Sequence, residues 1–156
     1  MNKDDSVPEK RYRLYTLLRA EPKLICAPDA AFLLSMQGHK KVFYVEQDRN
    51  TSGVLQVASS KTKGYAVMAE LNLQRRHFPQ ETVNAFAVIM VAPSPKRREA
   101  LRAAIKEKPG AHLWRFASAT DLTPEKFLHS PVFYPCVGEP TSLIKKPMSS
   151  QPPAQP

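Results

Sequence analysis

The apolar and polar positions of the chain follow two spacings, one typical of strands and one of helices. Short apolar or alternating runs predict strands at Ala31–Leu34, Val42–Asp48, Ala85–Val91 and Leu113–Ala117. Apolar residues spaced three and four apart, with capping residues and prolines at the ends, predict helices at Val54–Leu73, Pro95–Lys108 and a short one at Pro124. Strands that alternate with helices indicate a layered α/β domain.

The ends of the chain differ from its middle. Residues 1–10 are polar and predicted to be flexible, and residues 145–156 form a Pro/Ser/Gln-rich tail predicted to be disordered. Between them, residues 11–144 are expected to form a single domain. Within that domain Tyr12–Leu18 fits a helix or an edge strand equally well, and both alternatives stay open.

Composition narrows the class of partner. Lys and Arg total 23 against 14 Asp and Glu, a net charge of +9, which favours a polyanionic partner such as DNA. The two cysteines, Cys26 and Cys136, are too few for a framework of disulfides and indicate a reducing, cytoplasmic setting. Cys26 is interpreted as a small buried residue. The longest apolar run, Ala85–Ala92, is too short to span a bilayer, so no membrane partner is expected.

Acidic residues are placed where the predicted strands begin and end. Side chains alternate along a strand, so Tyr44, Glu46 and Asp48 share one side of it. Asp29 lies at the entry to the preceding strand. If the two strands are neighbours, the three carboxylates Asp29, Glu46 and Asp48 converge at one sheet edge. A divalent cation such as Mg²⁺ or Mn²⁺ is the usual partner of oxygen ligands gathered in this way.

The predicted helix after these strands provides a cation. A helical projection puts Lys61, Tyr65 and Met68 on one apolar stripe. A lysine on a core-facing stripe needs an anion, and the Glu46/Asp48 pair is its natural partner. The Tyr65 hydroxyl is expected at the edge of the same site.

These residues resemble a known pattern. A Pro-Asp followed by an acid-x-acid at a strand end resembles the core of the PD-(D/E)XK, or restriction-endonuclease-like, nuclease superfamily. VEQDRNT with Lys61 and Tyr65 resembles more narrowly the plasmid replication-relaxation protein family, whose pattern is PD, E-x-D-R-G-T and K-x-x-x-Y. Downstream, AFAVIMVAPSPKRREAL, HLWRFASATDLTPEKFLHSPVFYP and TSLI are similar to later elements of that family. The resemblance covers Leu24–Ile144.

The resemblance implies a fold and an activity. The fold would be an α/β, restriction-endonuclease-like three-layer core, with a central mixed sheet flanked by helices. The activity would be that of a metal-dependent endodeoxyribonuclease, with Asp29, Glu46 and Asp48 holding Mg²⁺ or Mn²⁺ and Lys61 as the fourth catalytic residue. The biological setting would be plasmid or mobile-element replication or mobilisation, with relaxosome or replication proteins as partners.

The chain departs from the family pattern in three ways. Asn50 replaces a glycine, although asparagine tolerates positive φ better than most residues. Glu46-x-Asp48 replaces the acid-x-Lys of active restriction enzymes, so the lysine role would move to Lys61. Family members also usually have an N-terminal winged helix, which the residues before Pro28 are too few to form.

Several alternatives follow from the same residues. Six cations are candidates for nucleic-acid binding or for a merely solvated face: Arg75, Arg76, Lys96, Arg97, Arg98 and Arg102. Asp48 fits a turn, and Glu46 fits a structural ion pair with Lys61, as well as a metal site. The protein could therefore be an active nuclease, a non-catalytic DNA-binding accessory module with a degenerate nuclease fold, or a protein that recognises an acidic protein.

Overall fold

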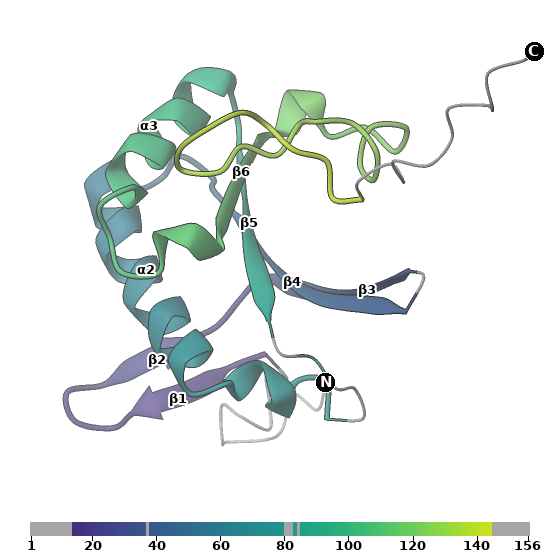
Figure 1. Ribbon diagram of the computed structural model, residues 1–156. Helices are drawn as coiled ribbons and strands as arrows, with labels where there is room; N and C mark the ends of the chain where they lie inside the picture. The colour runs from purple at the N-terminus through teal and green to yellow at the C-terminus, as the bar shows by residue number, and fades with distance from the viewer. Residues whose placement is uncertain (1–13, 37, 80–82, 84, 145–156) are drawn as a thin grey trace, which may run out of the picture.

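A four-stranded mixed sheet is the centre of the fold in the computed structural model, which describes residues 14–36, 38–79, 83 and 85–144 (Figure 1). The strands lie in the order β3-β4-β5-β6, with β3 antiparallel to β4 and the other two pairs parallel. They are β3 (Ala30–Met36), β4 (His39–Gln47), β5 (Phe86–Ala92) and β6 (Trp114–Ser118). The predicted mixed α/β sheet is confirmed. The expectations for residues 1–10 and 145–156 concern parts of the chain outside the described residues.

Two helices connect the parallel strands. Helix α2 (Val54–Glu70) leads from β4 to β5, and α3 (Pro95–Ile105) leads from β5 to β6. Ser94 caps α3 as predicted, since its hydroxyl accepts a hydrogen bond from the Arg97 N–H at 3.2 Å. Thr51 and Ser52, the residues of capping type before the predicted helix, do not cap α2, because its N-cap is Gly53.

Both helices end three residues earlier than predicted, where the backbone changes direction. After α2, Asn72 has a φ of 53° and begins the 3₁₀ turn η1 (Leu73–Arg76). After α3, the Lys108 N–H bonds to the Ile105 carbonyl at 2.9 Å and Gly110 has a φ of 76°. Positive φ cannot continue a right-handed helix, so the apolar spacing extends further than the helix itself.

The two described helices pack on the same face of the sheet (Figure 1). Tyr65 and Leu101 from these helices pack with Tyr44, Met90 and Trp114 from the strands. An irregular segment covers the other face, and the predicted short helix at Pro124 is instead a series of turns. Pro131, seven residues after Pro124, would end any helix that begins there, so at most about two turns are available. Within the described residues, the predicted flanking by helices therefore holds for one face only.

A second, two-stranded sheet packs against α2. It consists of β1 (Thr16–Arg19) and β2 (Leu24–Cys26), which are antiparallel. Of the two alternatives for Tyr12–Leu18, helix or edge strand, the structure shows a strand from Thr16 onward. Tyr12 lies outside the described residues. Among the described residues, no helix is long and apolar enough to cross a membrane.

Gly64 sets the distance between α2 and β2, and replacing it with alanine is expected to destabilise the protein. An added Cβ would lie 2.8 Å from the Ile25 carbonyl oxygen and 3.4 Å from the Cys26 Cβ. Alanine favours a helix by about 1 kcal/mol over glycine, but overpacking against backbone costs about 1–3 kcal/mol. We expect Gly64→Ala to lower the free energy of unfolding in a urea titration. Ser59→Ala, an exposed position of the same helix, is the control; a Gly64→Ala protein as stable as that control would contradict the close contact.

Candidate functional site

The three predicted acids converge at one end of the sheet. Asp29 precedes β3, and its Oδ2 accepts a hydrogen bond from the Gln47 N–H of β4 at 2.8 Å. Asp48 follows β4, and its N–H bonds to the Val91 carbonyl of β5 at 2.9 Å. Together with Glu46 and Lys61 these acids line a cavity of about 200 Å³. The convergence expected from strand parity is confirmed.

Glu46, near the end of β4, is buried beneath α2, with 3% of its side chain exposed. The Tyr65 hydroxyl donates to Oε1 at 2.6 Å, and Lys61 Nζ lies 3.0 Å from Oε2. Lys61 therefore meets the acid that its position on the apolar stripe required. Burial raises the pKa of Glu46 above its ordinary value, while Tyr65 and Lys61 oppose that shift. Both oxygens of this carboxylate have partners within the chain.

Asp48 is held by an arginine from α3. Arg97 Nε donates to Oδ2 at 2.7 Å and Nη2 donates to Oδ1 at 3.1 Å, a two-pronged pair with 4% of the Asp48 side chain exposed. The same Nη2 also donates to the Ser52 carbonyl at 2.7 Å. Asp48 Oδ1 further accepts from the Asn50 N–H at 3.2 Å, and Asn50 has the positive φ of 58° that its replacement of glycine required. The turn interpretation of Asp48 is thus confirmed.

The geometry gives a direct test of whether three carboxylates could share a divalent ion. Mg²⁺ takes oxygen ligands in near-octahedral geometry, each with a lone pair directed at the ion. Asp48 faces a guanidinium and Glu46 faces an ammonium and a phenol. Among the described residues, no group of three or more His, Cys, Asp or Glu side chains could hold a metal ion. In this arrangement the complete set does not fit a shared ion, and Asp29 beside Glu46 is the pair left to consider.

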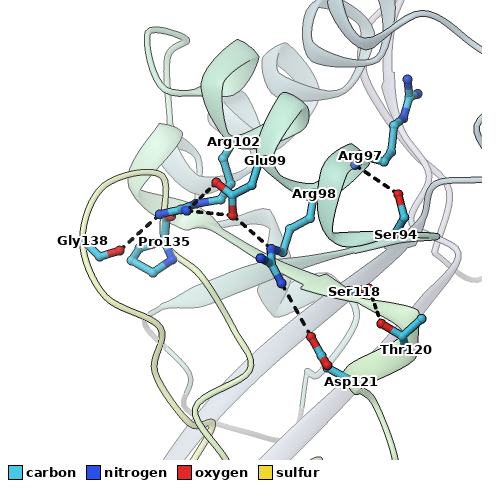
Figure 2. Close-up of polar contacts among 10 residues, drawn as sticks. All are labelled: Ser94, Arg97, Arg98, Glu99, Arg102, Ser118, Thr120, Asp121, Pro135 and Gly138. Carbon is cyan, nitrogen blue, oxygen red and sulfur yellow. Dashed lines mark hydrogen bonds and ion pairs between the residues drawn. The ribbon is translucent and has the colours of Figure 1, made fainter.

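Two of the predicted nucleic-acid-binding arginines contact the segment after β6 (Figure 2). Arg98 has 10% of its side chain exposed; it donates to Glu99 at 3.1 Å, and its guanidinium carbon lies 3.9 Å from the centre of the Tyr134 ring. Arg102 donates to the Pro135 carbonyl at 2.8 Å and to the Gly138 carbonyl at 3.1 Å. These two side chains hold the segment after β6 against α3.

The remaining predicted cations lie in two places. Lys96 is exposed in the first turn of α3, next to Arg97, whose side chain points away from Arg98 and Arg102 (Figure 2). Arg75 and Arg76 are exposed on η1, beyond the opposite end of α2 from the acids. A further exposed cation, Arg49, lines the acidic cavity and was absent from the predicted set.

The sequence interpretation missed a buried polar network. His77, which follows Arg75 and Arg76 in a basic stretch of the sequence, is 5% exposed; its Nδ1 lies 2.6 Å from the Tyr44 hydroxyl and its Nε2 lies 3.0 Å from the Thr16 hydroxyl. Gln74 is buried beside it, while the two arginines between them are exposed. This spacing of three residues matches a 3₁₀ turn and is the signal that could have revealed the burial.

Cys26 is buried, as the sequence interpretation expected, and it lies near Glu46. Its side chain is part of the core, and burial together with the nearby Glu46 raises the pKa of its thiol to about 12. At neutral pH it is therefore a protonated, unreactive thiol.

No family model, no curated protein and no solved structure matches this chain.

Proposed function

We propose that this protein is a non-catalytic DNA-binding module built on a restriction-endonuclease-like core. The observation that supports the proposal is that the chain's own cations neutralise the acids of its candidate site. Arg97 binds both oxygens of Asp48, and Lys61 with Tyr65 binds both oxygens of Glu46. Such pairs hold α2 and α3 to the end of β4, which is a structural role.

The arrangement of elements supports the proposed core. A hairpin, β3–β4, is followed by a helix and then by two parallel strands with a helix between them. The Pro-Asp lies at the start of the first hairpin strand and Glu46 near the end of the second, as the resembled pattern requires. On this basis the proposal extends to a role in plasmid or mobile-element replication, beside relaxosome or replication proteins.

The charge around the cavity supports phosphate binding. With Asp48 and Glu46 each paired, exposed Arg49 and Lys96 outnumber the remaining acid, exposed Asp29, and leave this end of the sheet with a small excess of positive charge. Phosphate contacts of this kind bind DNA without reading its sequence and weaken as salt is added. DNA would therefore lie across the loop after β4 and the first turn of α3.

A metal-dependent endodeoxyribonuclease is the second candidate, and one observation favours it. Asp29 is exposed and lines the same cavity as Glu46 and Lys61, the residue types and chain order that the resembled nucleases use. Asp29 and Glu46 would then hold Mg²⁺, which supplies an activated water. Mg²⁺ would then replace Lys61 as the counter-ion of buried Glu46, and the Lys61 side chain, 41% exposed, has room to move aside.

One experiment separates the two candidates. A fluorescent DNA duplex is titrated with the protein at two salt concentrations, and supercoiled plasmid is incubated with the protein and Mg²⁺ or Mn²⁺. The variants are Glu46→Gln, which keeps the shape of the acid, and the double change Arg49→Glu with Lys96→Glu. Lys63→Glu, exposed elsewhere on α2, is the matched charge control, and Arg75→Glu with Arg76→Glu tests the second basic region.

The proposal predicts a specific pattern. Two phosphate contacts, from Arg49 and Lys96, would weaken binding about tenfold between 50 and 200 mM salt. Arg49→Glu with Lys96→Glu should weaken it at least about tenfold relative to Lys63→Glu, because each reversal turns attraction into repulsion. Glu46→Gln should leave affinity unchanged and the plasmid should stay intact. Metal-dependent nicking that Glu46→Gln abolishes would establish the nuclease instead, and failure to bind DNA at physiological salt would leave an acidic protein as the partner class.

A further inference from the structure

The outer edge of β3 is the least protected surface of the sheet. Among the described residues, β4 is the only strand that pairs with β3, so every second residue of β3 directs its N–H and C=O away from the sheet. The hairpin projects away from the two helices, with β3 outermost (Figure 1). Such a row of backbone groups is a template for another strand.

The sequence of β3 has none of the features that usually block edge pairing. AAFLLSM contains no charged residue and no proline. Its side chains are apolar toward both faces of the sheet. Leu33 packs with the core on the face covered by the two helices, and Phe32 and Leu34 pack with the core on the other face. All three are only half-buried, so their outer surfaces stay in water when the strand has one neighbour.

We propose that β3 pairs with β3 of a second copy of this chain, antiparallel and about a two-fold axis at Leu33. A two-fold axis perpendicular to the sheet keeps the same face of both copies on one side, so paired residues must have the same parity. Centring on Leu33 is the register that pairs the whole strand: Leu33 faces Leu33, Phe32 faces Leu34, and Ala31 faces Ser35. The two four-stranded sheets then join into one continuous sheet.

Two further observations favour a second copy as the occupant. Phe32 of one copy would lie opposite Leu34 of the other, at the mouth of an apolar groove of about 460 Å³ lined by Leu34, Met36, Phe43, Leu143 and Ile144. The charges are also complementary. Exposed Asp29, just before β3, would lie on the same face as exposed Lys40 near the end of the second copy's hairpin.

The register predicts which cysteine can be cross-linked. Leu33→Cys places two thiols directly opposite each other at the axis, within the range of about 7 Å between Cα atoms that a disulfide spans. Ser35→Cys is the matched control, because its two copies would stand four residues apart along the strands, roughly 13 Å. After mild oxidation, non-reducing electrophoresis should show a disulfide dimer for Leu33→Cys, and for Ser35→Cys only the level that Cys26 and Cys136 give in the unaltered chain.

A charge on the edge tests the same surface without cross-linking. Ser35→Glu can pair within its own chain with Lys40, its cross-strand neighbour, so the monomer keeps its fold. In the dimer it would oppose Ala31 and approach Asp29 of the second copy. Sedimentation velocity across a concentration series should show a dimer that Ser35→Glu weakens at least about tenfold, while Ser59→Lys on α2 leaves it unchanged. A monomer at every concentration, or a dimer that Ser35→Glu and the cysteine pattern do not affect, would overturn the proposal.

Discussion

Replacing Arg97 with alanine is expected to lower the free energy of unfolding by about 3–5 kcal/mol, because it leaves the buried Asp48 carboxylate without its counter-ion. With Arg97 present the Asp48 side chain is 4% exposed, and without the guanidinium the carboxylate keeps only the Asn50 N–H as a donor from the described residues. The change also removes the donor to the Ser52 carbonyl, which fixes the loop that enters α2. Urea unfolding monitored by the fluorescence of Trp114 measures the effect.

Companion variants distinguish the ion pair from general damage to α3. Arg97→Lys keeps the charge but lacks the planar guanidinium that donates two hydrogen bonds to Asp48. It should therefore recover only part of the stability that Arg97→Ala loses. Asp48→Asn added to Arg97→Ala removes the unpaired charge and should be more stable than Arg97→Ala alone. Lys96→Ala, the exposed neighbour, should stay within about 0.5 kcal/mol of the original protein. An Arg97→Ala protein as stable as Lys96→Ala would show that Asp48 is not held by this pair.

His77→Ala is expected to cost about 2–4 kcal/mol, since it combines a core cavity with the loss of two buried hydrogen bonds. The ring lies against Tyr44, edge to face at 5.5 Å between ring centres, and bonds to the hydroxyls of Tyr44 and Thr16. Its loss should loosen β1 from the rest of the fold as well as lower global stability. Hydrogen exchange at the amides of β1, together with urea unfolding, measures both effects.

The neighbouring arginine provides the comparison. Arg76→Ala removes a larger side chain from the same 3₁₀ turn, but an exposed one, and should change stability by no more than about 0.5 kcal/mol. His77→Asn offers one of the two hydrogen bonds in a smaller volume and should fall between His77→Ala and the original protein. Equal stability of His77→Ala and Arg76→Ala would mean that the buried network contributes little to the fold.

Local pattern predicted the elements that form the sheet and its two helices. Strand parity placed Glu46 on the same side as Tyr44, and helical spacing placed Lys61 and Tyr65 toward them, as the structure has it. These features depend on neighbouring residues, or on the regular side-chain repeat of one strand or one helix, and both can be read from the sequence. The convergence of the three acids also followed, because neighbouring strands align their ends.

The sequence could not show which side chains far apart in the chain form ion pairs and hydrogen bonds. Arg97 is forty-nine positions from Asp48, and no local pattern distinguishes an arginine that binds a carboxylate from one that binds phosphate. The same ambiguity applies to Arg98 and Arg102, which are DNA-binding candidates by sequence and which contact Tyr134 and Pro135 in the fold. The sequence analysis did not predict the burial of His77, because a histidine between arginine and phenylalanine fits a surface loop as well as a core. Only its spacing of three residues from Gln74 indicates the burial.

The segment after β6 determines when the fold can be completed during synthesis. One face of the sheet, with Phe43 and Ile89, is covered by Phe127, Val132 and Phe133, which come after every strand of that sheet. The emerging chain can therefore form the helical side first while its second apolar face is still open to water. This face can be covered only after the residues that contact Arg98 and Arg102 have left the ribosome. Until then the nascent chain exposes an apolar surface of the kind that chaperones bind, which the folded protein covers.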